Sequence, residues 1–295
     1  MTPSFRIIGL GEVLWDLFPD GNYFGGAPAN MACTAAGLLG ASGDVKLISA
    51  LGDDQHGREA VNFLEQRHVD VSEIQITDAP TGTVTVKLDD SGQPLFNISA
   101  NSAWDNIVWS ERWRDLAANV DAICFGSLAQ RGNTSRETIQ KFIGATSADA
   151  LKVFDMNVRA PFYEPGTLIQ SLKLSNVLKL NDLELCIIAE ILSISGDSID
   201  VLKRLQDDYQ ISTIALTQGS AGAVLIHHSE AVNVPSVPTT VVDTVGAGDA
   251  FTAALIIGLL KNQSLTEIAN FAIDVSSYVC SERGATPRLP DWIGG

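Results

Sequence analysis

The chain has 295 residues, of which 45% are hydrophobic and 18% charged, and its formal net charge at pH 7 is −16. This size allows one large hydrophobic core or at most two domains, and the acidic charge argues against binding to nucleic acids and to anionic membranes. No apolar run is long enough to span a bilayer, and the N-terminus lacks the basic-then-apolar pattern of a signal peptide. Four scattered cysteines indicate reduced thiols, so we expect a cytoplasmic protein.

Apolar strand-like runs alternate with helical patterns along most of the chain. Residues 5–10 and 45–51 predict strands, while residues 29–39 and 57–68 predict the helices that follow them. Further strands, each followed by a helical stretch, are predicted at residues 122–125, 152–154, 177–180 and 213–216. This alternation is typical of a three-layer α/β/α fold with a mostly parallel, doubly wound sheet, which binds ligands at the carboxyl ends of its strands.

Two segments interrupt this rhythm. Residues 15–24 are aromatic and rich in turn formers, and residues 83–99 alternate apolar and polar side chains around an Asp-Asp-Ser-Gly turn at 89–92. The two segments could pair as a small accessory sheet. We therefore expect a single domain over residues 1–295, with lid segments at about 14–25 and 81–100 inserted into it.

The sequence DTVGAGDAF at residues 243–251 joins a β-type stretch at 239–242 to an apolar run at 252–260. This pattern predicts a strand, a tight turn and a buried helix. A helix N-terminus rich in small residues is an anion site, because free N–H groups and the positive end of the helix dipole converge there. The carboxylate of Asp249 lies in this anion site and needs an explanation.

One explanation is that Gly246 and Gly248 only form the turn and that Asp249 only stabilises the helix dipole. The alternative is chemical: a substrate hydroxyl that attacks a phosphate must lose its proton, and a weak base suffices in a loose transition state. We predict that the helix end keeps Asp249 ionised for this task, while the N–H groups of Ala247, Gly248 and Asp249 stabilise the phosphoryl group.

Other nucleotide-binding signatures are absent or incomplete. The sequence has no Gly-Lys dipeptide and hence no Walker-type loop, and its four histidines lack zinc-ligand spacing. The pair Gly9 and Gly11 begins a dinucleotide fingerprint, but Leu14 stands where the third glycine belongs. This disfavours a nucleotide-dependent oxidoreductase.

The chain resembles the ribokinase-like (PfkB) sugar kinases over nearly its whole length. Six motifs occur in the family's order: GGAPAN at 25–30, DMNVR at 155–159, NDLE at 181–184, TQGSAG at 217–222, DTVGAGD at 243–249 and GATP at 284–287. The resemblance implies a ribokinase-like fold with a β-sheet lid, ATP as co-substrate, Mg²⁺, and possibly K⁺.

The resemblance also implies roles for single residues. Asp249 corresponds to the catalytic base, and the anion hole to Gly246, Ala247 and Gly248. Glu184 corresponds to the acid that organises Mg²⁺ largely through water, and Asn181 supports it. Arg159 would approach the phosphates or the sugar. Asp243 and Gly284 would lie near a site for a monovalent cation. The ATP site corresponds to Asn181, Thr217, Gly219, Gly222, Gly246 and Gly248. Residues that would contact the sugar are Asp16, Gly25, Gly26, Asn30, Asn97 and Arg131.

Several of these residues have simpler explanations. Asn181 and Glu184 fit a helix cap and a first-turn acid, and an exposed arginine such as Arg159 is usually only solvated. Asn30 is compatible with an N-cap. Ile273 stands where relatives often carry an asparagine near the adenine, so contacts to the base are expected to be looser.

Two further motifs, AWD at 103–105 and FGSLAQR at 125–131, resemble the bacterial fructokinase branch. With Asn97 and Asn101 as polar lid groups, they predict D-fructose as the sugar, phosphorylated at a primary hydroxyl. Ribokinase, 2-keto-3-deoxygluconate kinase and an inactive sugar-binding regulator on the same fold remain alternatives. The unpaired edges of a small lid sheet favour a homodimer that pairs lid to lid.

Overall fold

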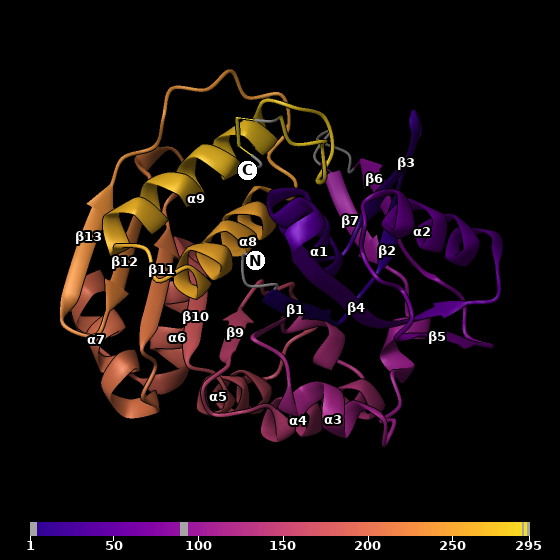
Figure 1. Ribbon diagram of the computed structural model, residues 1–295, viewed down its shortest axis with the longest axis horizontal. Coiled ribbons are helices and arrows are strands. Elements are labelled where there is room, and N and C mark those ends of the chain that lie inside the picture. Colours follow the sequence, from indigo (N-terminus) through magenta and orange to yellow (C-terminus); the bar gives the residue numbers. More distant parts are fainter. Residues whose placement is uncertain (1–4, 89–93, 291, 294–295) are drawn as a thin grey trace.

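The computed structural model describes residues 5–88, 94–290 and 292–293. Within these residues a nine-stranded sheet forms the centre of the molecule (Figure 1). In spatial order its strands are β13 (Glu230–Val234), β12 (Ala223–His227), β11 (Thr213–Thr217), β10 (Val177–Asn181), β9 (Leu151–Asp155), β8 (Ala122–Phe125), β1 (Phe5–Leu10), β4 (Gly43–Gly52) and β5 (Ile74–Thr77).

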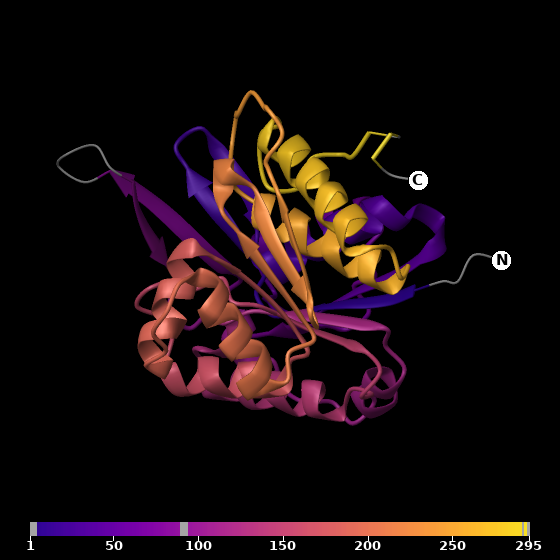
Figure 2. The ribbon, with the colours of Figure 1, turned by 90° about the vertical axis from the view of Figure 1, so that its left-hand side faces the viewer.

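Helices cover both faces of this sheet, and each face has its own hydrophobic core, so the three-layer prediction is confirmed (Figure 2). One face carries α1 (Ala27–Leu39), α2 (Gln55–Gln66), α8 (Ala247–Leu260) and α9 (Leu265–Cys280). The other carries α3 (Trp113–Ala118), α4 (Asn133–Ala145), α5 (Pro165–Leu174), α6 (Asp182–Leu192) and α7 (Ser198–Tyr209). Among the described residues no helix is both long and apolar enough to cross a membrane.

Seven neighbouring strands of this sheet run parallel to one another: β5, β4, β1, β8, β9, β10 and β11. The expected helix after residues 213–216 is wrong, because β11 is followed by the antiparallel strands β12 and β13. A short 3₁₀ turn over Gly219–Ala221 and Gly222, at φ 105°, reverses the chain there. A methyl group at Gly222 would lie 2.0 Å from the carbonyl oxygen of Val234, so only glycine allows this reversal.

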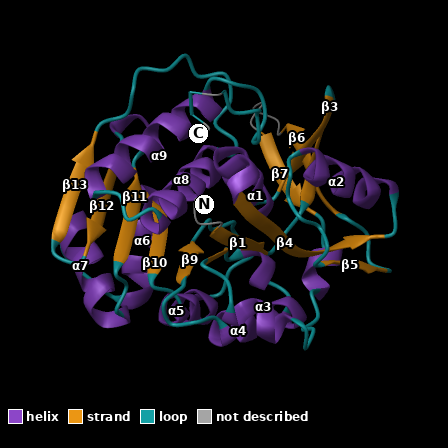
Figure 3. Cartoon of the chain, in the orientation of Figure 1, coloured by secondary structure: helices purple, strands orange, loops and turns teal. Residues whose placement is uncertain are grey.

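The predicted accessory sheet is present. Its strands lie in the order β3 (Gly21–Gly25), β2 (Leu14–Phe18), β6 (Gly82–Leu88) and β7 (Pro94–Ile98) (Figure 3). The central pair, β2 and β6, joins the two distant segments in parallel register, and we call the four strands the small sheet. The turn predicted at residues 89–92 lies outside the described residues.

The segment before α8 differs from the prediction. Residues 239–242 form a loop rather than a strand, and Val241 and Val242 are each 60% exposed. The helix after it is buried along almost its whole length, as its continuous apolar sequence predicts. An exposed loop that leads into a buried helix therefore replaces the expected strand.

Candidate active site

A cavity of about 1110 Å³ opens at the carboxyl ends of β1, β9, β10 and β11, near the point where the strand order switches between β1 and β8. The small sheet and the loop at residues 235–246 contribute further walls. The predicted site residues that line this cavity are Asp16, Gly25, Gly26, Asn30, Arg159, Asn181, Thr217, Gly219, Gly222, Gly246, Ala247, Gly248, Asp249 and Ile273.

Asp249 lies in the first turn of α8, and its neighbours explain why the sequence needs small residues there. Gly246, which caps the helix, has φ 80°, and a methyl group on it would lie 2.4 Å from the carbonyl oxygen of Ala285. Asp249 is only 8% exposed and accepts a hydrogen bond of 2.8 Å from the Nδ2 atom of Asn30. One oxygen of the carboxylate is thus held by α1 at the edge of the cavity.

The pKa of Asp249 is raised to about 6. Burial is the largest cause and the carboxylate of Asp155 adds to it, whereas the hydrogen bond from Asn30 and the charges of Lys179 and Arg159 oppose it. The sequence predicts that the helix end keeps Asp249 ionised, whereas burial in the folded protein shifts its pKa toward the protonated form. At pH 7 the carboxylate form still outnumbers the acid roughly tenfold.

A buried ion pair, which the sequence analysis missed, lies beside the anion hole. The Nζ atom of Lys179 is 3.1 Å from Asp155, whose other oxygen accepts a hydrogen bond of 2.7 Å from Thr252 in α8. A methyl group at Gly248 would lie 2.8 Å from Nζ, so the ammonium group lies directly beside the first turn of α8. A lysine inside a predicted buried strand was the signal that could have revealed it.

Lys179 stays charged in this setting. Burial alone would lower its pKa, but the carboxylates of Asp155, Glu184 and Asp249 raise it above its ordinary value. The site therefore has a fixed cation and the free N–H groups of a helix end on the same side of the cavity.

Glu12 is a second residue that the sequence analysis missed. It follows β1, lines the cavity and is 2% exposed. Its Oε1 atom accepts a hydrogen bond of 3.2 Å from the N–H of Ala27, while Oε2 has no partner among the described residues. Burial raises the pKa of Glu12 to about 7, so near neutral pH much of it is protonated.

Asp16 faces the same end of the cavity from β2. Its pKa is raised to about 6, mainly by burial, with Arg159 lowering it and Asp243 raising it. Gly25 leaves room for it, since a methyl group there would lie 3.1 Å from its Oδ2 atom. Gly26, at φ 112°, allows still closer contact with the backbone of Glu12, because a methyl group there would lie 2.4 Å from the Glu12 carbonyl oxygen.

Glu184 is held by backbone groups. Its two oxygens accept hydrogen bonds of 2.9 Å from the N–H groups of Val158 and Asn181, and Asn181 caps α6 in return. Glu184 is 4% exposed and does not line the cavity. No cluster of three potential metal ligands from histidine, cysteine, aspartate and glutamate occurs among the described residues. Because both of its oxygens are engaged by backbone N–H groups, Glu184 does not fit direct coordination of Mg²⁺, and it would act on a metal ion in the cavity only through water.

Besides Glu184, three predicted residues do not line the cavity. Asn97 is exposed, because its neighbour Ile98 faces the cavity and successive side chains of a strand point to opposite sides. Arg131 lines a separate cavity of about 520 Å³ and is bonded to Asp105. The oxygens of Asp243 accept hydrogen bonds from two backbone N–H groups, those of Val245 and Gly284. The expected sugar contacts of Asn97 and Arg131 therefore do not fit the structure.

Comparison with known proteins agrees with this geometry. The model of the "pfkB family carbohydrate kinase" matches residues 19–292. A fructokinase of Klebsiella pneumoniae is 32% identical, with 97% of this chain and 96% of that protein covered.

The crystal structure of a sugar kinase from Pyrococcus horikoshii is 30% identical with a TM-score of 0.81, and the match covers 95% of this chain and 93% of that one. A fructokinase of Vibrio cholerae, 23% identical over 97% of this chain and 96% of its own, shares the fold with a TM-score of 0.80. The chain belongs to the pfkB family of carbohydrate kinases.

Proposed function

We propose that this sugar kinase is a fructokinase, which transfers the γ-phosphoryl group of ATP to a primary hydroxyl of D-fructose. The observation that carries the proposal is the buried carboxylate of Asp249, fixed by Asn30 at the N-terminus of α8 inside the large cavity. The fructokinases of Klebsiella pneumoniae and Salmonella typhimurium, 32% and 31% identical to this chain, support the choice of sugar.

In this proposal Asp249 is the general base. Asn30 holds one oxygen of its carboxylate, and the other accepts the proton of the sugar hydroxyl as that hydroxyl attacks the phosphate. The N–H groups of Ala247, Gly248 and Asp249 stabilise the charge on the transferred group, and the ammonium group of Lys179 lies beside them. Glu184 and Asn181 are the residues that would hold an Mg²⁺ ion bound with ATP, through water, and such an ion would supply further charge neutralisation.

The two ends of the cavity receive the two substrates. Asp16, Glu12 and Asn30 meet the sugar hydroxyls below the small sheet. At the other end, ATP lies along the carboxyl ends of β10 and β11, where Thr217, Gly219 and Gly222 line the cavity. Apolar side chains, including those of Ile273, Val237 and Val241, cover the adenine of ATP at this end of the cavity. A K⁺ ion beside Asp243 and Gly284 would complete the site.

One observation favours a second candidate. Arg159 lines the cavity and makes no ion pair with any described carboxylate. Such a cation is suited to the carboxylate of a sugar acid, as in 2-keto-3-deoxygluconate, as well as to the phosphates of ATP. Ribose lacks both a carboxylate and the additional hydroxymethyl group of fructose.

The decisive experiment measures ADP release with ATP, Mg²⁺ and D-fructose, D-ribose or 2-keto-3-deoxygluconate in turn. We expect kcat/KM for fructose to exceed that for the other two, because a site that hydrogen-bonds a hydroxyl rejects analogues without it by up to ~10⁴-fold. Equal turnover of ribose would overturn the fructokinase assignment and leave the kinase intact. Binding of ATP and sugar without any turnover would identify an inactive regulator instead.

Replacement of Arg159 by leucine separates the two sugar classes. If a sugar acid is the substrate, Arg159→Leu raises its KM far more than it raises the KM for ATP. If fructose is the substrate, Arg159→Leu should raise the KM for ATP more than it raises the KM for fructose.

A further inference from the structure

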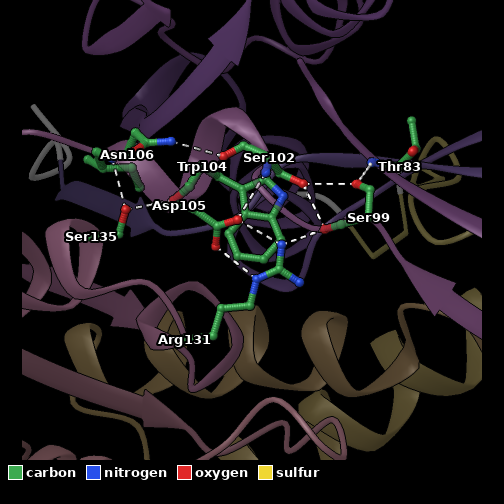
Figure 4. A network of polar contacts seen from close by, with 9 residues as sticks. Thr83, Ser99, Ser102, Trp104, Asp105, Asn106, Arg131 and Ser135 are labelled. Atoms are coloured by element: carbon green, nitrogen blue, oxygen red, sulfur yellow. Dashed lines mark hydrogen bonds and ion pairs between the residues drawn. The ribbon is translucent and has the colours of Figure 1, made fainter. Parts of the chain in front are cut away.

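The motifs at residues 103–105 and 125–131 meet where Arg131 contacts Asp105 and Trp104 (Figure 4), and Arg131 and Asp105 line the smaller cavity of about 520 Å³. The guanidinium group of Arg131 donates two hydrogen bonds of 2.8 Å to Asp105, one to each carboxylate oxygen. It also lies 4.0 Å above the ring of Trp104 and 5.0 Å from the centre of the Phe162 ring. The side chains of Arg131 and Asp105 are only 11% and 13% exposed, so this pair is largely shielded from water.

Arg131 also contacts the end of the small sheet at which β6 begins and β7 ends, which we call the base of the small sheet. The Nη2 atom of Arg131 donates a hydrogen bond of 2.5 Å to the carbonyl oxygen of Ser99, directly after β7. Ser99 in turn exchanges hydrogen bonds with Thr83 at the start of β6: its N–H donates to the carbonyl at 2.8 Å, and its Oγ accepts from the N–H at 3.0 Å. The next residues inward on the two strands, Val84 and Ile98, line the main cavity.

The other side of the pair is anchored to the main body. Asp105 closes a capping box with Ser102, and the carbonyl of Trp104 accepts a hydrogen bond of 2.7 Å from Ser135 in α4. Gly82 at the start of β6 is pressed against the indole, since a methyl group there would lie 2.2 Å from Nε1 of Trp104. The group formed by Arg131, Asp105, Trp104 and Ser99, which we call the arginine clamp, thus connects α4 to both strands.

We propose that Arg131 is a positioning residue that holds the base of the small sheet, so that Val84 and Ile98 stay over the sugar end of the cavity. The inference rests on the proposed sugar kinase function, but Arg131 acts through the backbone of Ser99 and touches no substrate. A buried ion pair adds little to stability over an apolar replacement, whereas its fork geometry fixes orientation. Loss of the clamp lowers the fraction of molecules whose small sheet is placed to bind sugar, and the apparent affinity falls by that fraction.

The test replaces Arg131 by glutamine and follows two quantities. Amide hydrogen exchange of the protein without ligands should become faster in β6 and β7, while the amides of the nine-stranded sheet keep their protection. The KM for the sugar should rise about tenfold if the competent fraction falls to about a tenth, with the KM for ATP and kcat nearly unchanged. Hydrolysis of ATP by water, relative to sugar phosphorylation, should increase because the cavity is less well covered.

Two further variants separate positioning from general stability. Arg131→Lys keeps the positive charge but not the forked pair of hydrogen bonds to Asp105. Its hydrogen exchange in β6 and β7 and its KM for the sugar should therefore lie between those of the wild type and of Arg131→Gln. Arg136→Gln is the matched control: this arginine is 24% exposed, contacts Gln130 and Glu164, and has no contact with Ser99 or Asp105. It should change neither the exchange of β6 and β7 nor the KM for the sugar.

Unchanged exchange in β6 and β7, or exchange that rises equally throughout the protein, would overturn the inference. If Arg131→Gln does not fold, Asp105→Asn breaks the same pair and is subject to the same criteria. The exchange measurement needs no sugar, so a wrong substrate assignment leaves its outcome interpretable. An active fructokinase with a normal KM in folded Arg131→Gln would refute the clamp alone.

Discussion

At the scale of single residues, the buried carboxylates of the cavity set its chemistry. Asp249, Glu12 and Asp16 all have pKa values raised mainly by burial, to about 6, 7 and 6. Arg159 and Lys179 provide the opposing positive charge at the cavity wall. Although the chain as a whole is acidic, two of its positively charged side chains thus line the cavity in which the phosphates of ATP must bind.

Replacement of Asp249 by asparagine removes the base at nearly constant size. We expect kcat to fall about 10²-fold or more, while ATP binding survives because the N–H groups of α8 remain. The wild-type pH profile of kcat/KM should decline below pH 6, where Asp249 becomes protonated, and the residual activity of the variant should lose this decline. Steady-state kinetics measure kcat and KM, and calorimetry measures ATP binding. Asp207→Asn, at an exposed position of α7, is the control and should leave both unchanged. Near-normal turnover of Asp249→Asn would disprove the mechanism.

Glu12→Gln should stabilise the protein at high pH. The folded-state pKa of Glu12 is raised from 4.5 to about 7, so the folded chain holds this proton more tightly than the unfolded chain does. The associated stability is complete below about pH 4.5 and is lost as the pH rises through 7. The rise in pKa corresponds to ~3 kcal/mol, an upper bound for the gain in the free energy of unfolding at pH 8.

Urea unfolding at pH 5 and pH 8 measures this difference. The free energy of unfolding of Glu12→Gln should exceed that of the wild type clearly at pH 8 and only slightly at pH 5. Glu65→Gln on the exposed face of α2 is the control and should show no such dependence. A variant that is less stable than the wild type at pH 8 would mean that the ionised carboxylate of Glu12 is needed.

At the scale of elements, the first turn of α8 brings together the anion hole, the base and the contact with β10. Gly246 permits the turn because of its positive φ and its contact with Ala285, while Gly248 leaves room for Lys179. Thr252, one turn further along α8, binds Asp155 of β9. The helix end is therefore fixed to the strand ends below it.

Gly246→Ala should displace this turn. An alanine at φ 80° is strained, and its methyl group would lie 2.4 Å from a backbone oxygen, so the N–H groups of the anion hole must move. We expect kcat/KM to fall by roughly 10²-fold, the effect of losing one anion-hole donor. Gly144→Ala in α4, where a methyl group meets nothing within 4 Å, should instead leave kinetics unchanged and raise stability by up to ~1 kcal/mol. Equal behaviour of the two variants would contradict this account.

At the scale of the whole molecule, the active site combines residues that lie far apart in sequence. The hydrogen bond from Asn30 to Asp249 spans 219 residues and joins α1 to α8 on one face of the sheet. Two hydrophobic cores on one continuous sheet are compatible with the single domain expected over residues 1–295, which stays a prediction.

The small sheet has two edge strands, β3 and β7, whose outer backbone groups are unpaired within the described residues. Edge strands of this kind are commonly covered by another strand or by a second subunit. We therefore predict a homodimer formed through the small sheets. Sedimentation velocity over a range of micromolar concentrations should show a species of twice the chain mass, and a monomer at every concentration would contradict the prediction.

Sequence patterns alone predict six of the nine strands of the large sheet and the buried helix α8. Periodicity places strands at residues 122–125 and 177–180 within a residue of their observed ends, because a buried parallel strand is a continuous apolar run. The DTVGAGD motif likewise predicts its own turn, since small residues and a helix N-terminus are local features. The same local reasoning was wrong for residues 239–242, which form a loop, and for the segment after β11, where antiparallel pairing of the consecutive strands β11, β12 and β13 replaces the expected helix.

Which side chains contact one another depends on how distant segments of the chain pack. Which face of a strand a residue occupies depends on register, so the cavity receives Ile98 and not Asn97, although both belong to one short strand. Arg131 turns to Asp105 rather than to the cavity because their fork-shaped pairing is available only once two distant segments are packed together. The raised pKa values of Glu12 and Asp249 arise from burial, which is a property of the folded molecule and not of the residues taken one by one.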